Sequence, residues 1–234
     1  MNGKLYLIPT TLSEASWEAV LPAAVKQAIL ECKHFIVENE RTARRFLKKV
    51  ERSINIDELR FFLLNKHTSP REHNSFIAPL KSGQNVGLMS EAGCPGIADP
   101  GADIVRIAQD GNYTVVPFVG PSSIFLSLMA SGMNGQEFTF HGYLPIQKSK
   151  RIDAIKDLER KALRDGSTHI FIEAPYRNNH LFDDIIASCA GTTRLCVAVD
   201  ITSENESIKT KPISRWKSGK PNLHKRPTIF LMSR

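Results

Sequence analysis

The stretch SEAGCPGIADPG, residues 90–101, is poor in large side chains and rich in turn residues. It holds three glycines and two prolines, and it follows the apolar run from Val86 to Met89. Glycine lets the main chain approach a ligand closely and adopt positive φ, while proline stiffens the turn so that less entropy is lost on binding. The composition predicts a loop that cradles a ligand with main-chain groups. A plain connection from a strand to a helix has the same composition and stays open as the alternative.

Two carboxylates in this loop, Glu91 and Asp99, have the chemistry of a proton acceptor. A general base of this kind assists when the acceptor of a transferred group is a weakly acidic hydroxyl. Each carboxylate also has a plainer interpretation. Glu91 holds hydroxyl or amine groups of the ligand, and Asp99, which precedes Pro100, caps the helix that follows.

A second ligand position is predicted at Ser122 and Ser123, which follow the turn formed by Val119, Gly120 and Pro121. Either serine can cap a helix that ends near Gly132. The first turn of a helix presents free N–H groups and a partial positive charge, which suit a carboxylate or a phosphate.

Basic residues gather in two segments of a chain whose formal net charge is +7. Residues 41–52 hold six basic residues and one acid, and residues 209–226 hold seven basic residues and no acid. Such clusters bind a phosphate backbone well, and Trp216 within the second segment is placed to stack on a base. The alternatives are a solvated helix face for the first segment, and packing of Trp216 against its own domain for the second.

Short apolar strands alternate with helical patterns in the first half of the chain. Continuous apolar strands between helices indicate a mostly parallel sheet covered on both faces. The predicted strands are 5–8, 34–37, 61–64, 85–90 and 114–118, and the predicted helices begin near Pro22 and Thr42 and span 71–78 and 101–110. Loop 90–101 therefore follows the carboxyl end of a strand, where open α/β sheets bind their ligands.

From Glu137 onward the pattern changes, and a second α/β domain is predicted. The boundary is placed so that the domains are residues 1–118 and 119–234, because 234 residues exceed the usual size of one domain. The expected elements are helices at 149–164 and 176–190 and strands at 169–173, 194–201 and 228–232.

Composition excludes several classes of protein. No run of eighteen apolar residues exists, so neither export nor membrane insertion is expected, and four cysteines without a CxxC pair fit a reducing cytoplasm. The glycine-rich signatures of dinucleotide-binding and P-loop proteins are missing, and the scattered histidines predict no metal site.

Four blocks of the chain resemble one known family. SEAGCPGIADPG is similar to the loop S-D-A-G-x-P-x-I-S-D-P-G of the tetrapyrrole methylase superfamily, in particular of its branch of ribosomal RNA small subunit methyltransferase I. VGPSS at 119–123, GYLP at 142–145 and FIEAPYR at 171–177 resemble further blocks of that family, in the same order.

The resemblance implies an S-adenosylmethionine-dependent methyltransferase with two α/β domains, a cofactor cleft between them, and a homodimer. The cofactor-binding residues that it implies are Pro9, Ser90, Ala92, Gly93, Cys94, Ile97, Ser122, Ser123, Phe171, Glu173 and Thr202. Ribosomal RNA of the small subunit is the implied substrate, with its ribose 2′-hydroxyl as acceptor. The residues predicted to bind RNA are Arg44, Arg45, Lys148, Lys150, Arg151, Arg177 and Lys217.

Departures from the family leave two other functions open. Ile8-Pro9-Thr10-Thr11-Leu12 lacks the Gly-Asn pair that the family has after its first strand, and the chain is shorter than long members at its carboxyl end. A small-molecule methyltransferase of the tetrapyrrole type is the second hypothesis, although the net charge of +7 disfavours it. A non-catalytic RNA-binding protein that keeps the fold is the third.

Overall fold

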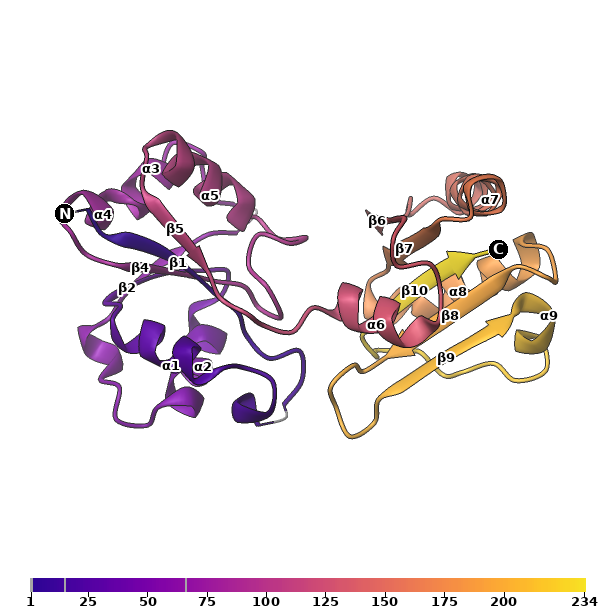
Figure 1. The fold of residues 1–234 in the computed structure, drawn as a ribbon, viewed down its shortest axis with the longest axis horizontal. Helices are drawn as coiled ribbons and strands as arrows, with labels where there is room; N and C mark the ends of the chain where they lie inside the picture. Colours follow the sequence, from indigo (N-terminus) through magenta and orange to yellow (C-terminus); the bar gives the residue numbers. More distant parts are fainter. Residues whose placement is uncertain (1, 15, 66) are drawn as a thin grey trace. The chain divides into compact units, whose positions relative to one another are not determined.

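A computed structural model of the protein describes residues 2–14, 16–65 and 67–234. The chain divides into two compact units, Met1–Ser122 and Ser123–Arg234, and each has its own sheet (Figure 1). The sequence-based boundary after residue 118 lies a few residues before this division. The predicted fold class, two α/β domains with parallel or mixed sheets, is confirmed.

Unit 1 is built on a five-stranded sheet in the order β3-β2-β4-β1-β5, and all its strand pairs are parallel. Its strands are β1 (Lys4–Ile8), β2 (His34–Val37), β3 (Arg60–Leu63), β4 (Val86–Met89) and β5 (Thr114–Pro117). All four residues of β4 are buried, as expected of a central strand with helices on both faces. The continuous apolar runs of the sequence therefore mark this sheet correctly.

Helices cover both faces of the sheet in unit 1 (Figure 1). The helices α1 (Ala23–Leu30) and α2 (Glu40–Val50) pack on one face, around Phe35 and Leu47. On the other face, α5 (Gly101–Asp110) packs with the short helices α3 (His73–Phe76) and α4 (Ala78–Lys81), around Ile36 and Ile104. Two 3-10 turns, η1 (Trp17–Ala19) and η2 (Ile56–Glu58), complete this unit.

The single helix predicted at 71–78 is wrong, because α3 and α4 are separate turns. Pro79 explains the break: it lacks the N–H group that a continuous helix needs, and its ring clashes with the preceding turn. Helix α2 follows the prediction closely, with Ala43, Phe46 and Leu47 buried. It begins two residues earlier than expected, because the Asn39 side chain accepts the N–H groups of Arg41 and Thr42.

Unit 2 contains a mixed sheet in the order β6-β7-β10-β8-β9. β6 and β7 run parallel, whereas β10 is antiparallel to both β7 and β8, and β8 is antiparallel to β9. The strands are β6 (Phe138–Tyr143), β7 (Thr168–Ile172), β8 (Arg194–Val199), β9 (Ser207–Pro212) and β10 (Thr228–Ser233). The sequence prediction missed β6 and β9, whose residues are mostly half-buried and alternate poorly in hydropathy.

The helices of unit 2 are α6 (Ser123–Ser131), α7 (Lys148–Asp165), α8 (Asn178–Ser188) and α9 (Ile213–Trp216), with the 3-10 turn η3 (Pro175–Arg177) before α8. One hydrophobic core joins α7, α8 and α9 to the sheet. Trp216 lies in that core with 3% of its surface exposed, and its indole N–H donates to the Leu195 carbonyl at 3.0 Å. The hypothesis that Trp216 stacks on a base is therefore wrong, because its ring contacts Phe182 inside the unit.

Candidate functional site

Loop 90–101 lies in unit 1 at a point where the connections between strands lead to opposite edges of the sheet. From β4 the chain passes through α5 to β5 at one edge, whereas from β2 it passes through α2 to β3 at the other edge. Ligands of open α/β sheets bind outside the carboxyl ends of strands at such a point. The tertiary structure thus puts the loop at the position that the sequence pattern indicates.

The main chain of this loop is strongly turned. Gly93 and Gly96 both have φ of 79°, and Ala98 has φ of 62°, an uncommon value for a residue with a Cβ atom. Gly93 is bonded to the loop after β1, since its carbonyl accepts the Thr10 N–H at 2.9 Å. The Ser90 hydroxyl donates to the same carbonyl at 3.1 Å, so this predicted cofactor residue also holds the shape of the loop.

Asp99 stabilises the second half of the loop. One of its carboxylate oxygens accepts the N–H groups of Gly96 and Gly101, both at 2.8 Å. Burial raises the pKa of Asp99, although these two N–H groups act against that shift. The bond to Gly101, the first residue of α5, agrees with the interpretation of Asp99 as a helix cap, so we do not assign it the role of base.

Two other segments that contain predicted cofactor residues also meet the loop here. A Cβ atom added to Gly120 would lie 2.2 Å from the Pro9 Cβ, so the turn after β5 packs directly on Pro9. The Cys94 thiol lies 3.6 Å from the Gly120 carbonyl oxygen and 3.5 Å from that of Pro121. Within unit 1 the structure therefore brings the predicted segments around Pro9, Gly93 and Gly120 together.

The remaining predicted cofactor residues of this region differ in exposure. Ala92 and Ile97 are exposed, with 56% of the Ile97 surface accessible. Ser122 closes unit 1 and Ser123 begins α6 in unit 2, and both are half-buried.

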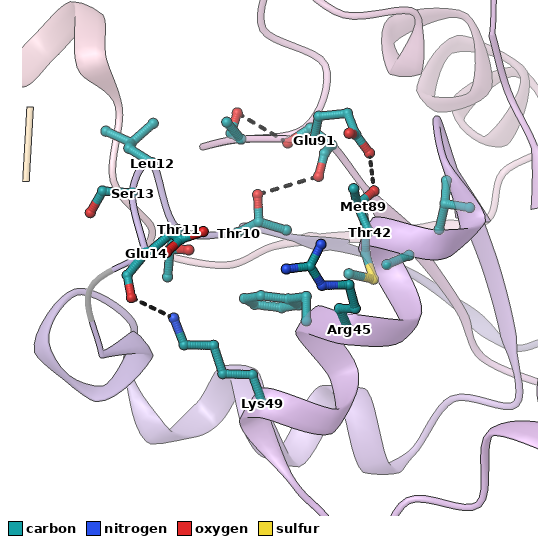
Figure 2. A pocket seen from close by; sticks show the side chains of 15 residues that line it. Thr10, Thr11, Leu12, Ser13, Glu14, Thr42, Arg45, Lys49, Met89 and Glu91 are labelled. Atoms are coloured by element: carbon teal, nitrogen blue, oxygen red, sulfur yellow. Dashed lines mark hydrogen bonds between the residues drawn. The ribbon is translucent and has the colours of Figure 1, made fainter. Parts of the chain in front are cut away.

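A cavity of about 540 Å³ opens beside this loop, wholly within unit 1 (Figure 2). Its walls come from the loop after β1, from α2 and from the end of β4. Its lining residues are Thr10, Thr11, Leu12, Ser13, Glu14, Val37, Thr42, Ala43, Arg45, Phe46, Lys49, Met89, Ser90, Glu91 and Ala92. The volume lies within the range of pockets that hold small organic ligands.

Glu91 is the predicted catalytic residue that lines this pocket. Its carboxylate accepts the Thr42 hydroxyl at 2.5 Å, as Figure 2 shows, and its main-chain N–H donates to the Glu38 carboxylate at 3.2 Å. Burial raises the pKa of Glu38, and the charges of Asp99 and Glu91 raise it further. The sequence analysis missed Glu38. Glu38 could have been predicted from its position directly after β2. The carboxyl ends of parallel strands lie at the same end of a sheet, so a residue after β2 lies near the loop after β4.

The two arginines that are adjacent in α2 have different surroundings. Arg44 forms an ion pair with Glu40 and lies over the Phe61 ring, 5.3 Å from its centroid. Arg45 lines the pocket, and its side chain makes no hydrogen bond or ion pair with the residues that the structure describes. Figure 2 shows its guanidinium pointing toward Thr10 and Thr11, while the Lys49 ammonium donates to the Glu14 carbonyl at 2.9 Å.

In unit 2, Glu173 and Arg177 form a largely buried pair after β7. Their atoms approach to 2.6 Å, and the Arg177 guanidinium also lies over the Tyr176 ring. The second carboxylate oxygen of Glu173 and the amide oxygen of Asn178 are both buried. Neither has a hydrogen-bond partner among the described atoms. Buried acceptors without partners are rare in native proteins and indicate a missing donor, such as a ligand.

Two predicted cofactor residues of unit 2 behave differently. Phe171 is fully buried and its ring stacks on Phe230 in the core, while the contact of its segment with the cofactor stays a prediction. Thr202 lies in the turn between β8 and β9 with φ of 67°, and its N–H donates to the Glu206 carboxylate at 2.7 Å. Asp200 in the same turn also has a positive φ, of 50°. Strained residues of this kind persist mainly at functional sites.

The basic residues predicted to bind RNA from unit 2 separate into two groups. Lys148, Lys150 and Lys217 are exposed. Arg151 is 7% exposed, and it pairs with the buried Asp184 carboxylate at 2.6 Å while donating to the Ile146 carbonyl. The prediction that Arg151 binds RNA is therefore wrong, because this ion pair joins α7 to α8 inside the unit.

No group of three or more potential metal ligands occurs among residues 2–14, 16–65 and 67–234. Over the same residues, no helix combines the length and apolar character that a membrane crossing requires. Three of the four thiols, those of Cys32, Cys189 and Cys196, are buried.

Comparison with known proteins identifies the family. The family model described as "Tetrapyrrole (Corrin/Porphyrin) Methylases" matches residues 18–216, which is most of the chain. The protein belongs to this family. As a tetrapyrrole methylase, it is a methyltransferase that depends on S-adenosylmethionine, which confirms the predicted family and cofactor.

Two relatives of this tetrapyrrole methylase share a name. It is similar to "Ribosomal RNA small subunit methyltransferase I" of Escherichia coli O157:H7, with 28% identity over 99% of this chain and 78% of that protein. The protein of the same name from Streptococcus pyogenes serotype M3 is 30% identical over 91% of this chain and 70% of that protein. The crystal structure of the methyltransferase CobJ superposes with a TM-score of 0.66 at 13% identity, covering 99% of this chain and 94% of that one. The last likeness concerns the fold alone.

Proposed function

We propose that this methyltransferase acts on RNA, at a ribose 2′-hydroxyl of small-subunit ribosomal RNA. The observation that carries the proposal is that relatives named for this substrate align with 99% and 91% of the chain. The net charge of +7 and the exposed basic residues of α2 and β9 favour a polyanionic substrate. The homodimer that the resemblance implies stays a prediction.

The residues of loop 90–101 fit a nucleoside cofactor. Exposed Ala92 and Ile97 offer small and apolar contacts, and positive φ at Gly93 and Gly96 turns the main chain without a side chain in the way. In unit 2, the unpartnered oxygen of Glu173 suits a hydroxyl donor such as those of a ribose. S-adenosylmethionine, when bound, supplies a methyl group that its sulfonium already activates.

The protein's own residues then have two tasks, to orient the acceptor and to receive its proton. Glu91 and Glu14 are carboxylates on the pocket wall, and Glu91 is the one that belongs to the predicted ligand loop. Its bond to the Thr42 hydroxyl fixes its direction. We assign to Glu91 the acceptance of the proton from the 2′-hydroxyl. Glu38 accepts the Glu91 main-chain N–H and so positions the residue without touching the substrate.

RNA contacts are assigned to the cations that remain exposed. These are Arg45, Lys148, Lys150 and Lys217 of the predicted set, together with Lys209 of β9. Arg44 is held by Glu40 and by the Phe61 ring, so we give it no RNA contact. Arg177 is bonded to Glu173, and we give it the positioning of that carboxylate in place of the predicted RNA contact.

The test compares ribose methylation across small-subunit ribosomal RNA from cells with and without the gene. We expect one or a few 2′-O-methyl groups to be lost in the absence of the gene, and to return with the wild-type gene but not with a Glu91→Gln variant. Unchanged ribose methylation, together with cofactor binding by the purified protein, would contradict the RNA assignment and favour a small-molecule acceptor. Absence of cofactor binding by calorimetry would favour a non-catalytic RNA-binding protein.

A further inference from the structure

The pocket of unit 1 has two chemically different sides. Thr10, Thr11 and Arg45 lie along one side, and Glu91 with Thr42 forms another, as Figure 2 shows. Leu12, Val37, Phe46 and Met89 add apolar surface to the lining. A ligand that fits must therefore combine an anionic group, hydrogen-bond donors and a flat or apolar portion.

Arg45 is the residue of this pocket that is most clearly without a partner. Arg44, one residue earlier in the same helix, is held by Glu40 and by the Phe61 ring, whereas the Arg45 guanidinium makes no hydrogen bond or ion pair with any described residue. A guanidinium carries five N–H donors in a fork that matches a phosphate. The Thr10 hydroxyl already donates to the Ser90 carbonyl, whereas Thr11 is half-buried on the same wall. An unpaired arginine beside Thr11 on a pocket wall is a fitting site for one phosphate group.

We infer that the pocket of unit 1 binds one unstacked nucleotide of single-stranded RNA, with Arg45 as its phosphate-binding residue. The inference rests on the proposed function and adds to it the class of RNA and a residue that recognises it. The phosphate lies on Arg45, the ribose hydroxyls face Glu91, and the base lies against the apolar part of the lining.

The size of the pocket favours one unpaired nucleotide. A volume of about 540 Å³ suits a single nucleotide, and the pocket is lined by the loop after β1, by α2 and by the end of β4. A base inside a duplex cannot enter such a space, because its neighbours on both sides stay stacked on it. Sequence-specific RNA proteins reach bases in loops and bulges for this reason.

The experiment measures binding of a short fluorescent single-stranded oligoribonucleotide by anisotropy at several salt concentrations, for the full chain and two variants. Arg45→Gln removes the proposed phosphate contact, and we expect affinity to fall by about 10- to 100-fold, as for loss of charged hydrogen bonds. The slope of log affinity against log salt is expected to decrease by about 0.7, the value for one contact to a single strand. Arg44→Gln makes the same change of charge one residue away, and its affinity is expected to stay within about twofold of the wild type, because Arg44 already has partners.

Several results would overturn the inference. Equal losses for Arg45→Gln and Arg44→Gln would show that only the charge of α2 matters. Equal affinity of the wild type for the oligonucleotide and for its duplex would remove the argument for an unstacked nucleotide. If the wild type binds RNA and Arg45→Gln binds it unchanged, the inference fails while the proposed function stands. If the wild type binds S-adenosylmethionine but no RNA, the proposed function fails with it.

Discussion

Glu91 differs from Asp99 and Glu38 in lining the pocket, which it shares with Glu14. Asp99 uses one oxygen to bind two N–H groups of its own loop, and Glu38 accepts the main-chain N–H of Glu91. Glu91 is bonded to a hydroxyl that orients it and remains on the wall where a substrate enters. Among residues of equal chemistry, the surroundings thus decide which one acts on the substrate.

Replacement of Glu91 by glutamine keeps the size of the side chain and removes the proton acceptor. We expect the Glu91→Gln variant to lose about 10²- to 10⁴-fold in the rate of methyl transfer, the usual contribution of a general base. Single-turnover transfer of a radioactive methyl group to small-subunit RNA measures this rate. Asp103→Asn, on exposed α5 surface, is the matched control. A Glu91→Gln rate equal to that of the control would exclude Glu91 as the base.

Cys94 offers a second test at the residue scale. Burial raises the pKa of Cys32 and of Cys189 to about 12 and also raises that of Cys196, so these thiols are unreactive in the folded protein. Burial also raises the pKa of Cys94, but Cys94 is only half-buried in the predicted cofactor loop, so a reagent reaches its thiol, whereas the other three thiols are buried. We expect a disulfide reagent to modify Cys94 alone in the native protein, and all four thiols after unfolding. Saturating S-adenosylmethionine should slow the native reaction, and equal rates with and without it would argue against a cofactor beside Cys94.

At the scale of elements, glycines decide how closely the loops of unit 1 approach. The turn after β5 lies against the loop after β1 because Gly120 has no side chain where Pro9 sits. Loop 90–101 likewise approaches Leu12 and the Pro121 carbonyl at Gly93, where a Cβ atom would lie 3.1 Å from each. These contacts hold three loops at one edge of the sheet, so the candidate site depends on main-chain packing as much as on side chains.

Gly120→Ala tests this packing. The added Cβ would lie 2.2 Å from the Pro9 Cβ, so the two loops must move apart. We expect a loss of about 1–3 kcal/mol in the free energy of unfolding, as for other overpacked sites, and weaker binding of S-adenosylmethionine. Gly135→Ala is the control, since no atom lies within 4 Å of its added Cβ. Urea unfolding measures both variants, and equal stability of the two would show that the loops adapt without cost.

At the scale of the whole molecule, pH acts on a histidine pair in unit 2. The His141 and His169 rings approach with 2.9 Å between their nitrogens, across the neighbouring strands β6 and β7. Burial lowers the pKa of both histidines, and Lys161 lowers each further. Two protonated rings at this distance would repel each other, so the folded state disfavours their charged forms.

The sign of the pH effect follows from these lowered pKa values. The unfolded chain binds protons on these histidines below about pH 6.5, the ordinary value, whereas the folded chain binds them only at lower pH. Their contribution to stability is therefore complete above about pH 6.5 and is lost as the pH falls through the lowered values. Urea unfolding between pH 8 and pH 5 should show this decline, and His141→Gln should reduce it. His180→Gln, at an exposed position of α8, should leave it unchanged. An equal decline for His141→Gln and the wild type would contradict the assignment.

The sequence by itself determined the features that depend on local pattern. Continuous apolar runs marked the five strands of unit 1, the spacing of Ala43, Phe46 and Leu47 marked the buried face of α2, and loop 90–101 marked the family. These predictions succeed because a buried strand or a buried helix face requires apolar residues at regular positions along the chain. The break at Ile77 could also be predicted from Pro79, since proline is accepted in the first turn of a helix but not in its interior.

Only the tertiary structure decided which polar groups are available. Arg151 and Lys150 are adjacent and carry the same charge, but Arg151 is buried against Asp184 while Lys150 is exposed to solvent. Arg44 and Arg45 likewise differ only in their neighbours, and the part played by Glu38 appears only when the ends of β2 and β4 meet. The availability of a charged group depends on residues far away in the sequence, because ion pairs and burial form across the fold. The local sequence pattern therefore does not predict which partner a charged residue has.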